Sequence, residues 1–381
     1  MKKPKIRFNG FNDDWEQRKL GEVADIVGGG TPSTNVSNYW DGNIDWYAPA
    51  EISDQIFLSS SQRKITEKGY NNSSAKMLPI GTVLFTSRAG IGKTAILSKK
   101  GCTNQGFQSI VPHKDELDSY FIFSRTDELK RYGEIVGAGS TFVEVSGKQM
   151  ANIEMMMPKT ISEQKVIGAY FAKLDHLITL HQRKCDEIKK LKKYMLQNMF
   201  PQDEEKVPKI RFYGFTDDWE QRKLGKIVEV HNGKDYKHLE KGNIPVYGTG
   251  GYMLSVSESL SDTQDAIGIG RKGTIDKPYI LRAPFWTVDT LFYCIPREEN
   301  DLNFIFDIFQ NINWRLMDES TGVPSLSKKS INNVKILVPN KKEQKQIGLY
   351  FNQLDHLITL HQRKCDELKN MKKFMLQNMF V

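Results

Sequence analysis

Cysteine pairs and long apolar runs are missing from this chain, and no secretory leader is expected from its first residues. Its 381 residues include four cysteines, none of them in a CxxC pair: Cys102, Cys185, Cys294 and Cys365. Isolated cysteines argue against a zinc ribbon or a thioredoxin-like site and indicate reduced packing residues. No stretch approaches the roughly 18 uninterrupted apolar residues of a membrane-spanning helix. Lys2 and Lys3 are not followed by the apolar core of a secretory signal, so a cytoplasmic protein is expected.

Complete catalytic motifs are missing as well. AGIGKT, beginning at Ala89, ends like a phosphate-binding P-loop, but Ser87 stands where that motif needs its first glycine. The 14 prolines include no adjacent pair, and so no NPPY-type element that would hold a flipped base in a methyltransferase. Glu187 and Lys189 resemble part of a nuclease motif, but they lie in a charged helical segment. These deficits predict a protein that binds and positions.

Size and charge give the first positive indications. A chain of 381 residues exceeds the size at which one hydrophobic core stops growing, so two or more domains are expected. Lys and Arg number 54 against 46 Asp and Glu, which gives a net charge of +8. This moderate basic excess favours an anionic partner. A hydrophobic content of 39% is that of an ordinary folded protein.

The chain is an internal duplication. PKIRFNGFNDDWEQRKLG from Pro4 returns as PKIRFYGFTDDWEQRKLG from Pro208, identical at 16 of 18 positions. Residues 163–200 return at 343–380, identical at 30 of 38 positions, whereas the stretches between have largely diverged. Two copies of one fold are therefore expected. The predicted division is a first variable domain (1–160), a first helix (161–200), a linker with a second variable domain (201–340) and a second helix (341–381).

The conserved ends have the heptad spacing of a coiled coil. Apolar residues recur at alternating steps of four and three over about 39 residues, or roughly 58 Å of helix. A helix of this length needs a partner, and the other copy is the obvious one. Two equivalent halves related by a pseudo-two-fold axis would pair antiparallel, with Leu174 opposite Leu368 and Ile188 opposite Leu354. The expected seam comprises Ile167, Phe171, Leu174, Ile178, His181, Ile188, Ile347, Phe351, Leu354, Ile358, His361 and Leu368.

Two features of these helices leave alternatives open. His181 and His361 lie near the middle of their seams, where a polar residue commonly fixes register and more rarely binds a metal. A second apolar stripe exceeds what a two-helix seam can bury. Either the repeated segments around Phe8 and Trp15 cover this stripe, or a partner protein does. The stripe comprises Tyr170, Leu177, Leu180, Leu191, Tyr194, Tyr350, Leu357, Leu360, Met371 and Phe374.

The variable middles look like small mixed domains. Short β-like runs such as GTVLFTS, QSIVP and IPVYG are separated by Gly, Asn and Pro, and helical patches such as SYFIFSRTDELKRYG lie between them. The predicted fold class is α+β, with two small domains joined by two long helices. These helices are expected to form an antiparallel coiled coil with pseudo-two-fold internal symmetry.

The pattern as a whole resembles the specificity subunit of type I restriction-modification enzymes. The resemblance rests on the paired DDWEQRKLG openings, GGGTPS at Gly28 followed by YWDGNIDW, SRAGIGK at Ser87, NQGFQS at Asn104, and the paired EQxxIGxYFxxLDHLI helix openings. It covers essentially the whole chain. The second variable region departs from it, with HNGKDYKHLEKGNIPVYGTGG in place of GGTPS, and so resembles a different class of target-recognition domain.

This resemblance implies a non-catalytic DNA-recognition subunit. Its two variable domains would each recognise one half of a split DNA target, held apart by the paired helices. Two adenine methyltransferase subunits would dock on it, and two motor-nuclease subunits would complete the restriction enzyme. The chain itself would hold no metal or cofactor, whereas S-adenosylmethionine, ATP and Mg would be bound by the partner subunits.

The residues expected at the DNA are basic and amide side chains in the variable loops. Lysine and arginine would neutralise phosphates, while an arginine fork suits guanine and an amide suits adenine. Arg88 and Arg271 are aligned at equivalent positions beside glycine-rich loops. The expected DNA-binding residues are Ser87, Arg88, Lys93, Asn104, Gln105, Gln108, Lys234, Arg271 and Lys272.

Two other functions remain as alternatives. A duplicated DNA-binding protein without enzyme partners, such as a repressor or an inactive reservoir of recognition domains, would have the same DNA-facing features. A nucleotide-dependent nuclease would use AGIGKT, and a nucleotide-binding assay would separate it from the other two.

Overall fold

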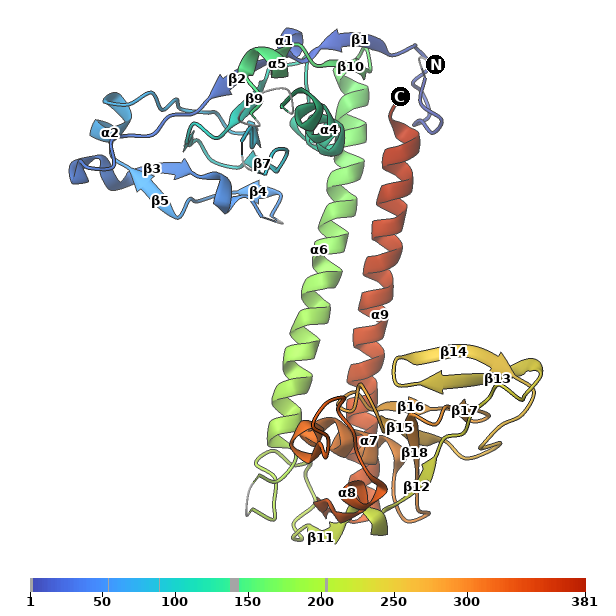
Figure 1. Ribbon diagram of the computed structural model, residues 1–381. Coiled ribbons are helices and arrows are strands. Elements are labelled where there is room, and N and C mark those ends of the chain that lie inside the picture. The colour runs from blue at the N-terminus through green and yellow to red at the C-terminus, as the bar shows by residue number, and fades with distance from the viewer. Residues whose placement is uncertain (1–2, 54, 89, 138–143, 203–204) are drawn as a thin grey trace. The chain divides into compact units, whose positions relative to one another are not determined.

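The computed structural model describes residues 3–53, 55–88, 90–137, 144–202 and 205–381 (Figure 1). The chain divides into two compact units, Met1–Leu180 with Lys364–Val381, and His181–Arg363. The long helices α6 (Ile161–Asn198) and α9 (Lys341–Met379) each contribute one part to either unit. Among the described residues, no helix is both long and apolar enough to cross a membrane.

The first unit combines three sheets with short helices. Strands follow the orders β2-β9-β6-β7-β4, β5-β3-β8 and β1-β10. The strands are β1 (Glu16–Lys19), β2 (Ala24–Gly28), β3 (Trp40–Tyr47), β4 (Phe57–Leu58), β5 (Arg63–Ile65), β6 (Val83–Phe85), β7 (Thr94–Leu97), β8 (Cys102–Thr103), β9 (Gln108–Pro112) and β10 (Glu154–Met157). The helices are α1 (Leu20–Val23), α2 (Glu67–Asn71), α3 (Ser119–Ser124), α4 (Thr126–Gly137) and α5 (Gly147–Ala151), with 3₁₀ turns η1 (Ser37–Tyr39) and η2 (Pro49–Glu51).

The second unit repeats this plan with fewer elements. Its sheets have the orders β12-β18-β15-β16, β14-β13-β17 and β11-β19. The strands are β11 (Glu220–Lys223), β12 (Val228–Asn232), β13 (Lys241–Gly248), β14 (Gly251–Val256), β15 (Ala266–Gly270), β16 (Tyr279–Leu281), β17 (Trp286–Thr287), β18 (Leu291–Pro296) and β19 (Lys335–Val338). The helices are α7 (Leu302–Asn311) and α8 (Lys328–Asn333), with 3₁₀ turns η3 (Leu224–Lys226) and η4 (Trp314–Met317). The α+β class expected from the sequence is confirmed in both units.

The same contact between the repeated opening segment and the long helix occurs in both units. In the first, Arg7 donates twice to Glu163, at 2.7 and 2.8 Å, and the Trp15 indole N–H donates to the same carboxylate at 3.2 Å. The second unit repeats the arrangement with Arg211 and Glu343, again at 2.7 and 2.8 Å. The repeated DDWEQRKLG and EQ segments are thus conserved between the copies because they pack on each other.

The glycines of the repeated helix openings allow α6 and α9 to approach the variable regions closely. A Cβ at Gly168 would lie 2.4 Å from a carboxylate oxygen of Asp118, the N-cap of α3. A Cβ at Gly348 would lie 2.5 Å from the matching oxygen of Asp301, the N-cap of α7. Any larger residue would therefore push these helix N-termini away from the long helices.

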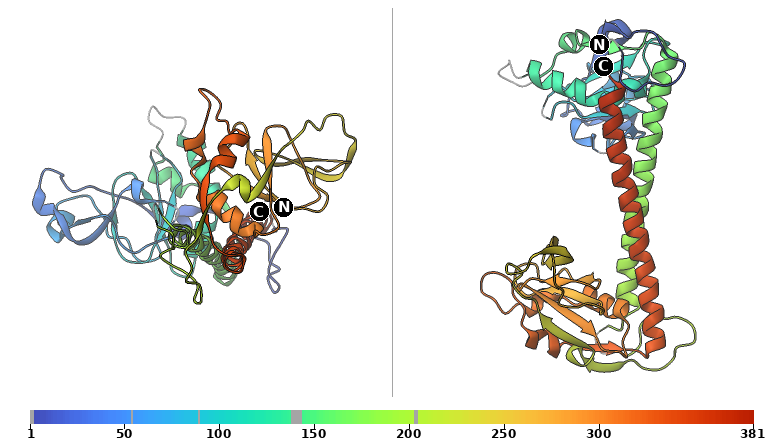
Figure 2. Two further views of the ribbon diagram at one scale, coloured as in Figure 1. Left: turned by 90° about the horizontal axis from the view of Figure 1, so that it is seen from below. Right: turned by 90° about the vertical axis from the view of Figure 1, so that its right-hand side faces the viewer.

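Within each unit, parts of α6 and α9 run antiparallel and side by side (Figures 1 and 2). In the first unit, Lys372 Nζ donates to Asp175 at 2.6 Å, and Leu174 shares one hydrophobic core with Leu368. In the second, Ile188 packs against the core that contains Leu354. The antiparallel pairing and these two seam contacts agree with the heptad analysis.

The paired histidines face each other in the second unit. Nδ1 of His181 lies 2.9 Å from Nδ1 of His361, so one ring donates a hydrogen bond and the other accepts it. Across the described residues, no group of three or more His, Cys, Asp or Glu side chains is arranged to hold a metal ion. The two rings can form this hydrogen bond only when the helices are aligned in this way. The bond therefore supports a role of both histidines in fixing the register of the two helices.

A buried carboxyl in α7 makes the second unit sensitive to pH. Asp307 is 1% exposed, and its Oδ2 has no partner among the described residues. Burial raises its pKa well above the usual range, and Asp355 adds to this, although the Lys192 ammonium opposes it. The folded state therefore holds this proton more tightly than the unfolded state, so the group lowers stability as pH rises from its ordinary pKa towards its raised one.

Asp307→Asn is accordingly expected to raise the melting temperature at pH 8. A carboxyl whose pKa is raised by 1 in the folded state loses about 1.4 kcal/mol of folding stability at high pH. A neutral amide has no such loss. The gain should shrink as pH falls and vanish below about pH 3, where the wild-type carboxyl is protonated in both the folded and the unfolded state. Thermal unfolding of the two proteins across this range checks the expectation. A difference that stays constant with pH would contradict it.

Candidate nucleic-acid interface

The loop between β6 and β7 carries SRAGIGK. Thr86 organises it, because its Oγ1 accepts a hydrogen bond from the Lys93 amide at 2.9 Å and donates to the Gly90 carbonyl at 2.7 Å. Lys93 is exposed at the end of this loop. Thr94 then opens β7, a strand, whereas a P-loop continues into a helix. The nucleotide-binding alternative therefore lacks its structural context; Ala89 itself lies outside the described residues.

Ser87 is not on the surface. Its side chain is fully buried, and its Oγ has no partner among the described atoms. Its amide donates to the Gly106 carbonyl at 2.8 Å, and its carbonyl accepts from the Val145 amide at 2.9 Å. Ser87 therefore fixes the base of the loop and cannot touch DNA through its hydroxyl in this conformation.

Arg88 is exposed but already engaged. Its Nε donates to Glu144 Oε1 at 2.9 Å, in an ion pair whose partners are both partly open to solvent. A base contact by Arg88 would require the guanidinium to leave this carboxylate. Such a half-exposed pair is weak, at about 0 to 1 kcal/mol, so a phosphate or base could displace it.

NQGFQS forms the turn before β9 and the first two residues of that strand. Asn104 is half-buried, and its Oδ1 accepts from the Gly106 amide at 2.8 Å, so it shapes the turn. Gln108 is half-buried within β9. Gln105 is exposed, and its Oε1 accepts from the Thr31 hydroxyl at 2.5 Å. Of the three amides, Gln105 is therefore the one placed to meet a ligand.

The GGGTPS segment packs against this turn. The Gly30 amide donates to the Thr103 carbonyl at 2.9 Å. A Cβ at Gly29 would lie 1.9 Å from the Asn104 carbonyl oxygen, and one at Gly30 would lie 2.3 Å from the backbone of Ser74. Only glycine fits at either position. The motif therefore allows three backbone segments to lie in direct contact.

The second unit exposes Lys234, Arg271 and Lys272. The Lys234 amide donates to the Thr287 carbonyl at 2.9 Å. The Arg271 amide donates to Thr290 at 2.8 Å, and its carbonyl accepts from Leu326 at 2.9 Å. The Arg271 guanidinium lies 5.9 Å from the Phe292 ring centre and reaches the Asp289 carbonyl only at 3.5 Å, so most of its donors remain available.

The alignment of Arg88 with Arg271 is wrong by one residue. The two backbone bonds that hold Arg271 are those that hold Ser87 in the first unit, so Arg271 corresponds to Ser87 and Lys272 to Arg88. The strand pairing agrees, because Thr86 bridges to Phe107 as Gly270 pairs with Leu291. The sequence comparison aligned the two arginines because both are charged. Which residues of the two units correspond is fixed by the backbone pairing of the strands and not by the composition of the loops.

A further arginine was missed by the sequence analysis. Arg63 opens β5 and stands over the ring of Trp40, with its guanidinium carbon 3.7 Å from the ring centre. Trp40 was visible in YWDGNIDW, but nothing local in the sequence pairs it with Arg63. The pairing depends on how β3 and β5 lie side by side.

Two copies of one α+β fold, each exposing cations on its variable part, define a duplicated binding protein suited to nucleic acid. Comparison with protein families agrees. Residues 12–190 and 216–370 match the type I restriction modification DNA specificity domain, and the chain belongs to this family.

Named relatives are specificity subunits. The chain is 33% identical over 240 residues to the type I restriction enzyme MjaIX specificity subunit of Methanocaldococcus jannaschii, covering 60% of this chain and 54% of that protein. It thus spans about half the length of that relative. The MjaVIII specificity subunit of the same organism is 22% identical over 404 residues, covering 95% of this chain and 91% of that protein.

A solved structure has the same fold. The S subunit of a type I restriction-modification system from M. genitalium superimposes with a TM-score of 0.73 at 17% identity, covering 100% of this chain and 99% of that one. At this identity the likeness, which extends over essentially the whole of both chains, shows a shared fold.

Proposed function

We propose that this chain is the DNA-recognition subunit of a type I restriction-modification enzyme, with one variable region for each half of a split target. The duplication carries the proposal. Both units have the same strand plan, yet position 87 is a buried serine in the first and the matching Arg271 is exposed in the second. Related frames that carry different side chains at matched positions suit two different half-sites.

Non-specific attraction to DNA would come from the exposed cations of the loops. The net charge of +8 and the exposed Lys93, Lys234 and Lys272 suit phosphate contacts, which make binding steeply dependent on salt. Base recognition would then fall to forked and amide side chains such as Arg271 and Gln105. Ser87 would support the loop only through its backbone.

Methyltransferase subunits are the proposed occupants of the second apolar stripe. The segment that precedes each variable region contacts a stripe residue of its own unit: Phe8 lies 5.6 Å from Tyr170 in the first, and Phe212 lies 6.0 Å from Tyr350 in the second. Six stripe residues keep 39 to 55% of their surface exposed: Leu191, Tyr194, Leu357, Leu360, Met371 and Phe374. Apolar groups in sustained rows of this kind mark a protein partner.

The complete assembly would follow the family's plan. Two methyltransferase subunits would bind S-adenosylmethionine, and two restriction subunits would bind ATP and Mg. This chain would supply only DNA specificity and the docking surface for those subunits. The alternative of a DNA-binding protein that acts alone would leave the same stripe without a use.

Methylome sequencing of cells with and without the gene tests the proposal. We expect one split motif to be methylated at adenine in the parent and unmethylated in the deletion strain, and restored by the gene on a plasmid. Unchanged methylation, with the protein and an adjacent methyltransferase both expressed, would contradict it. Purification of the chain without methyltransferase, but with specific DNA binding, would favour the stand-alone alternative.

A further inference from the structure

The contact between Arg63 and Trp40 is a rigid, surface-facing arrangement in the first unit. Trp40 is 7% exposed, its indole N–H donates to the Ser33 carbonyl at 3.2 Å, and its ring meets Trp46 edge-on at 5.1 Å. The Trp46 indole N–H donates in turn to the Gly30 carbonyl at 2.8 Å. The ring under the Arg63 guanidinium is therefore fixed by both its neighbour and the glycine-rich loop.

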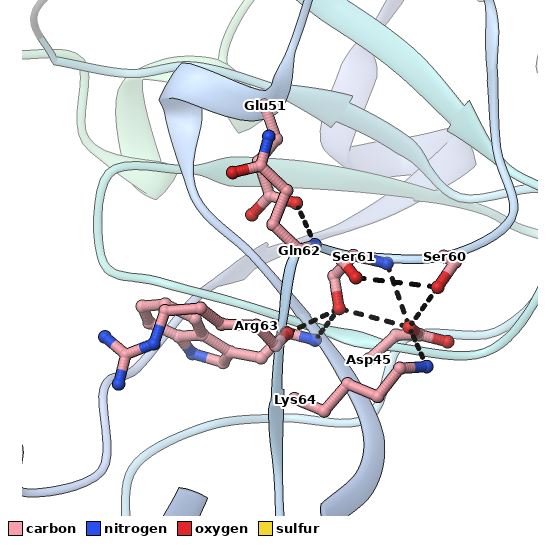
Figure 3. A network of polar contacts seen from close by, with 8 residues as sticks. Asp45, Glu51, Ser60, Ser61, Gln62, Arg63 and Lys64 are labelled. Atoms are coloured by element: carbon pink, nitrogen blue, oxygen red, sulfur yellow. Dashed lines mark hydrogen bonds and ion pairs between the residues drawn. The ribbon is translucent and has the colours of Figure 1, made fainter. Parts of the chain in front are cut away.

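A buried carboxylate anchors the strand that carries Arg63. Asp45 Oδ1 accepts from the Ser61 amide at 2.9 Å and from Lys64 Nζ at 2.7 Å, as Figure 3 shows. Burial opposes ionisation of Asp45, but the bonds from Lys64 and Ser61 outweigh it and hold its pKa below the usual range. The Ser61 hydroxyl also donates to the Arg63 carbonyl at 2.5 Å. The backbone on both sides of Arg63 is thus held in place.

The Arg63 side chain itself takes no part in this network. In Figure 3 its guanidinium extends away from Asp45 and the serines around it. Among the described residues, no hydrogen bond or ion pair engages its five N–H donors, and the residue is exposed. Arg88, in contrast, donates to Glu144. One face of the guanidinium is stacked on an indole ring, and its N–H groups remain available at the edge. This arrangement suits the donation of two parallel hydrogen bonds to one acceptor group.

The same loop that holds the two tryptophans also holds Gln105. Ser33 and Gly30 accept from the indoles of Trp40 and Trp46, and Thr31 between them donates to Gln105. The segment from Gly30 to Ser33 therefore contacts both the tryptophan pair beneath Arg63 and the Gln105 side chain. An arginine fork and a glutamine amide are the side chains that suit guanine and adenine in the major groove.

We propose that Arg63, held over Trp40, recognises a guanine in the half-site read by the first unit. The guanidinium edge would donate to guanine O6 and N7, and Trp40 would act as a positioning residue beneath it. Because stacking already restricts the side chain, less conformational entropy is lost when the two bonds form. This inference rests on the proposed function and adds to it a residue for the first half-site.

The experiment uses the full chain with its methyltransferase subunits, on cognate duplex and on a duplex whose first half-site is scrambled, at one salt concentration. Arg63→Ala is expected to weaken cognate binding about 10- to 100-fold and to leave the scrambled duplex nearly unchanged. Arg63→Lys should lose about as much, since an ammonium keeps the charge but has no fork. In cells, the methylated motif should become degenerate at one guanine of one half-site only.

Lys68→Ala is the matched control, because it removes one charge from the exposed helix α2 beside the same strands. It should weaken both duplexes equally and slightly. Full affinity of Arg63→Lys would instead assign Arg63 to a phosphate, and an unchanged motif with Arg63→Ala would also overturn the proposal. A complex without sequence preference before any substitution would contradict the proposed function itself. Unchanged thermal unfolding of each variant confirms that the fold is intact.

Discussion

Replacing Glu343 by alanine is expected to lower the free energy of unfolding by about 3 to 5 kcal/mol, the usual loss when one partner of a buried ion pair is removed. Glu343 is completely buried and accepts two bonds from Arg211, itself 10% exposed. The substitution leaves that guanidinium desolvated without its carboxylate. Loss of a proton would not relieve the charge, because an arginine guanidinium stays protonated in proteins even without a carboxylate partner.

Chemical denaturation of the variant beside Glu220→Ala measures this effect. Glu220 pairs with Arg222 on the surface at 2.7 Å, where an ion pair contributes at most about 1 kcal/mol. Glu163→Ala in the first unit should behave like Glu343→Ala, because Arg7 is bound there in the same way. Equal small losses for Glu220→Ala and Glu343→Ala would show that the repeated contact does not stabilise the fold.

Removing the ring of Phe200 is expected to cost about 3 to 5 kcal/mol, as for other buried phenylalanines. Phe200 is 5% exposed and follows the end of α6 by two residues. It stacks on Phe304 at 5.7 Å and meets Trp219 edge-on at 5.9 Å. Its duplicate Phe380 stacks on Phe171 at 5.7 Å but is only half-buried. Phe380→Ala should therefore cost less than Phe200→Ala.

Tyr213→Ala provides the control for this pair, because Tyr213 is fully exposed. Its unfolding free energy should stay within about 0.5 kcal/mol of the parent. The order of losses should be Phe200, Phe380, then Tyr213. A loss at Phe380 equal to that at Phe200 would mean that exposure does not distinguish the two copies.

The sequence predicted the features that depend on periodicity and repetition. Heptad spacing placed Leu174 with Leu368 in one core, and the duplication placed His181 opposite His361. Such patterns survive because a long helix has one geometry whatever surrounds it. The type of the variable regions, small and α+β, also followed from their short apolar runs.

Contacts between distant segments could not be predicted in this way. Nothing in GGGTPS shows that Gly30 meets Ser74, and nothing beside Arg63 shows that Trp40 lies beneath it. Ser87 looked accessible in a glycine-rich loop, yet the strand pairing turns it inwards. These outcomes depend on which strands become neighbours, and a single chain without a known partner strand does not determine that.

The proposed function requires that each variable region independently recognises one half of a split DNA sequence. The most direct measurement exchanges residues 24–157 for the matching segment of another family member and maps the methylated motif in cells that contain the same methyltransferase. We expect one half of the motif to change while the other half keeps its sequence. Simultaneous change of both halves, or of neither, would contradict it.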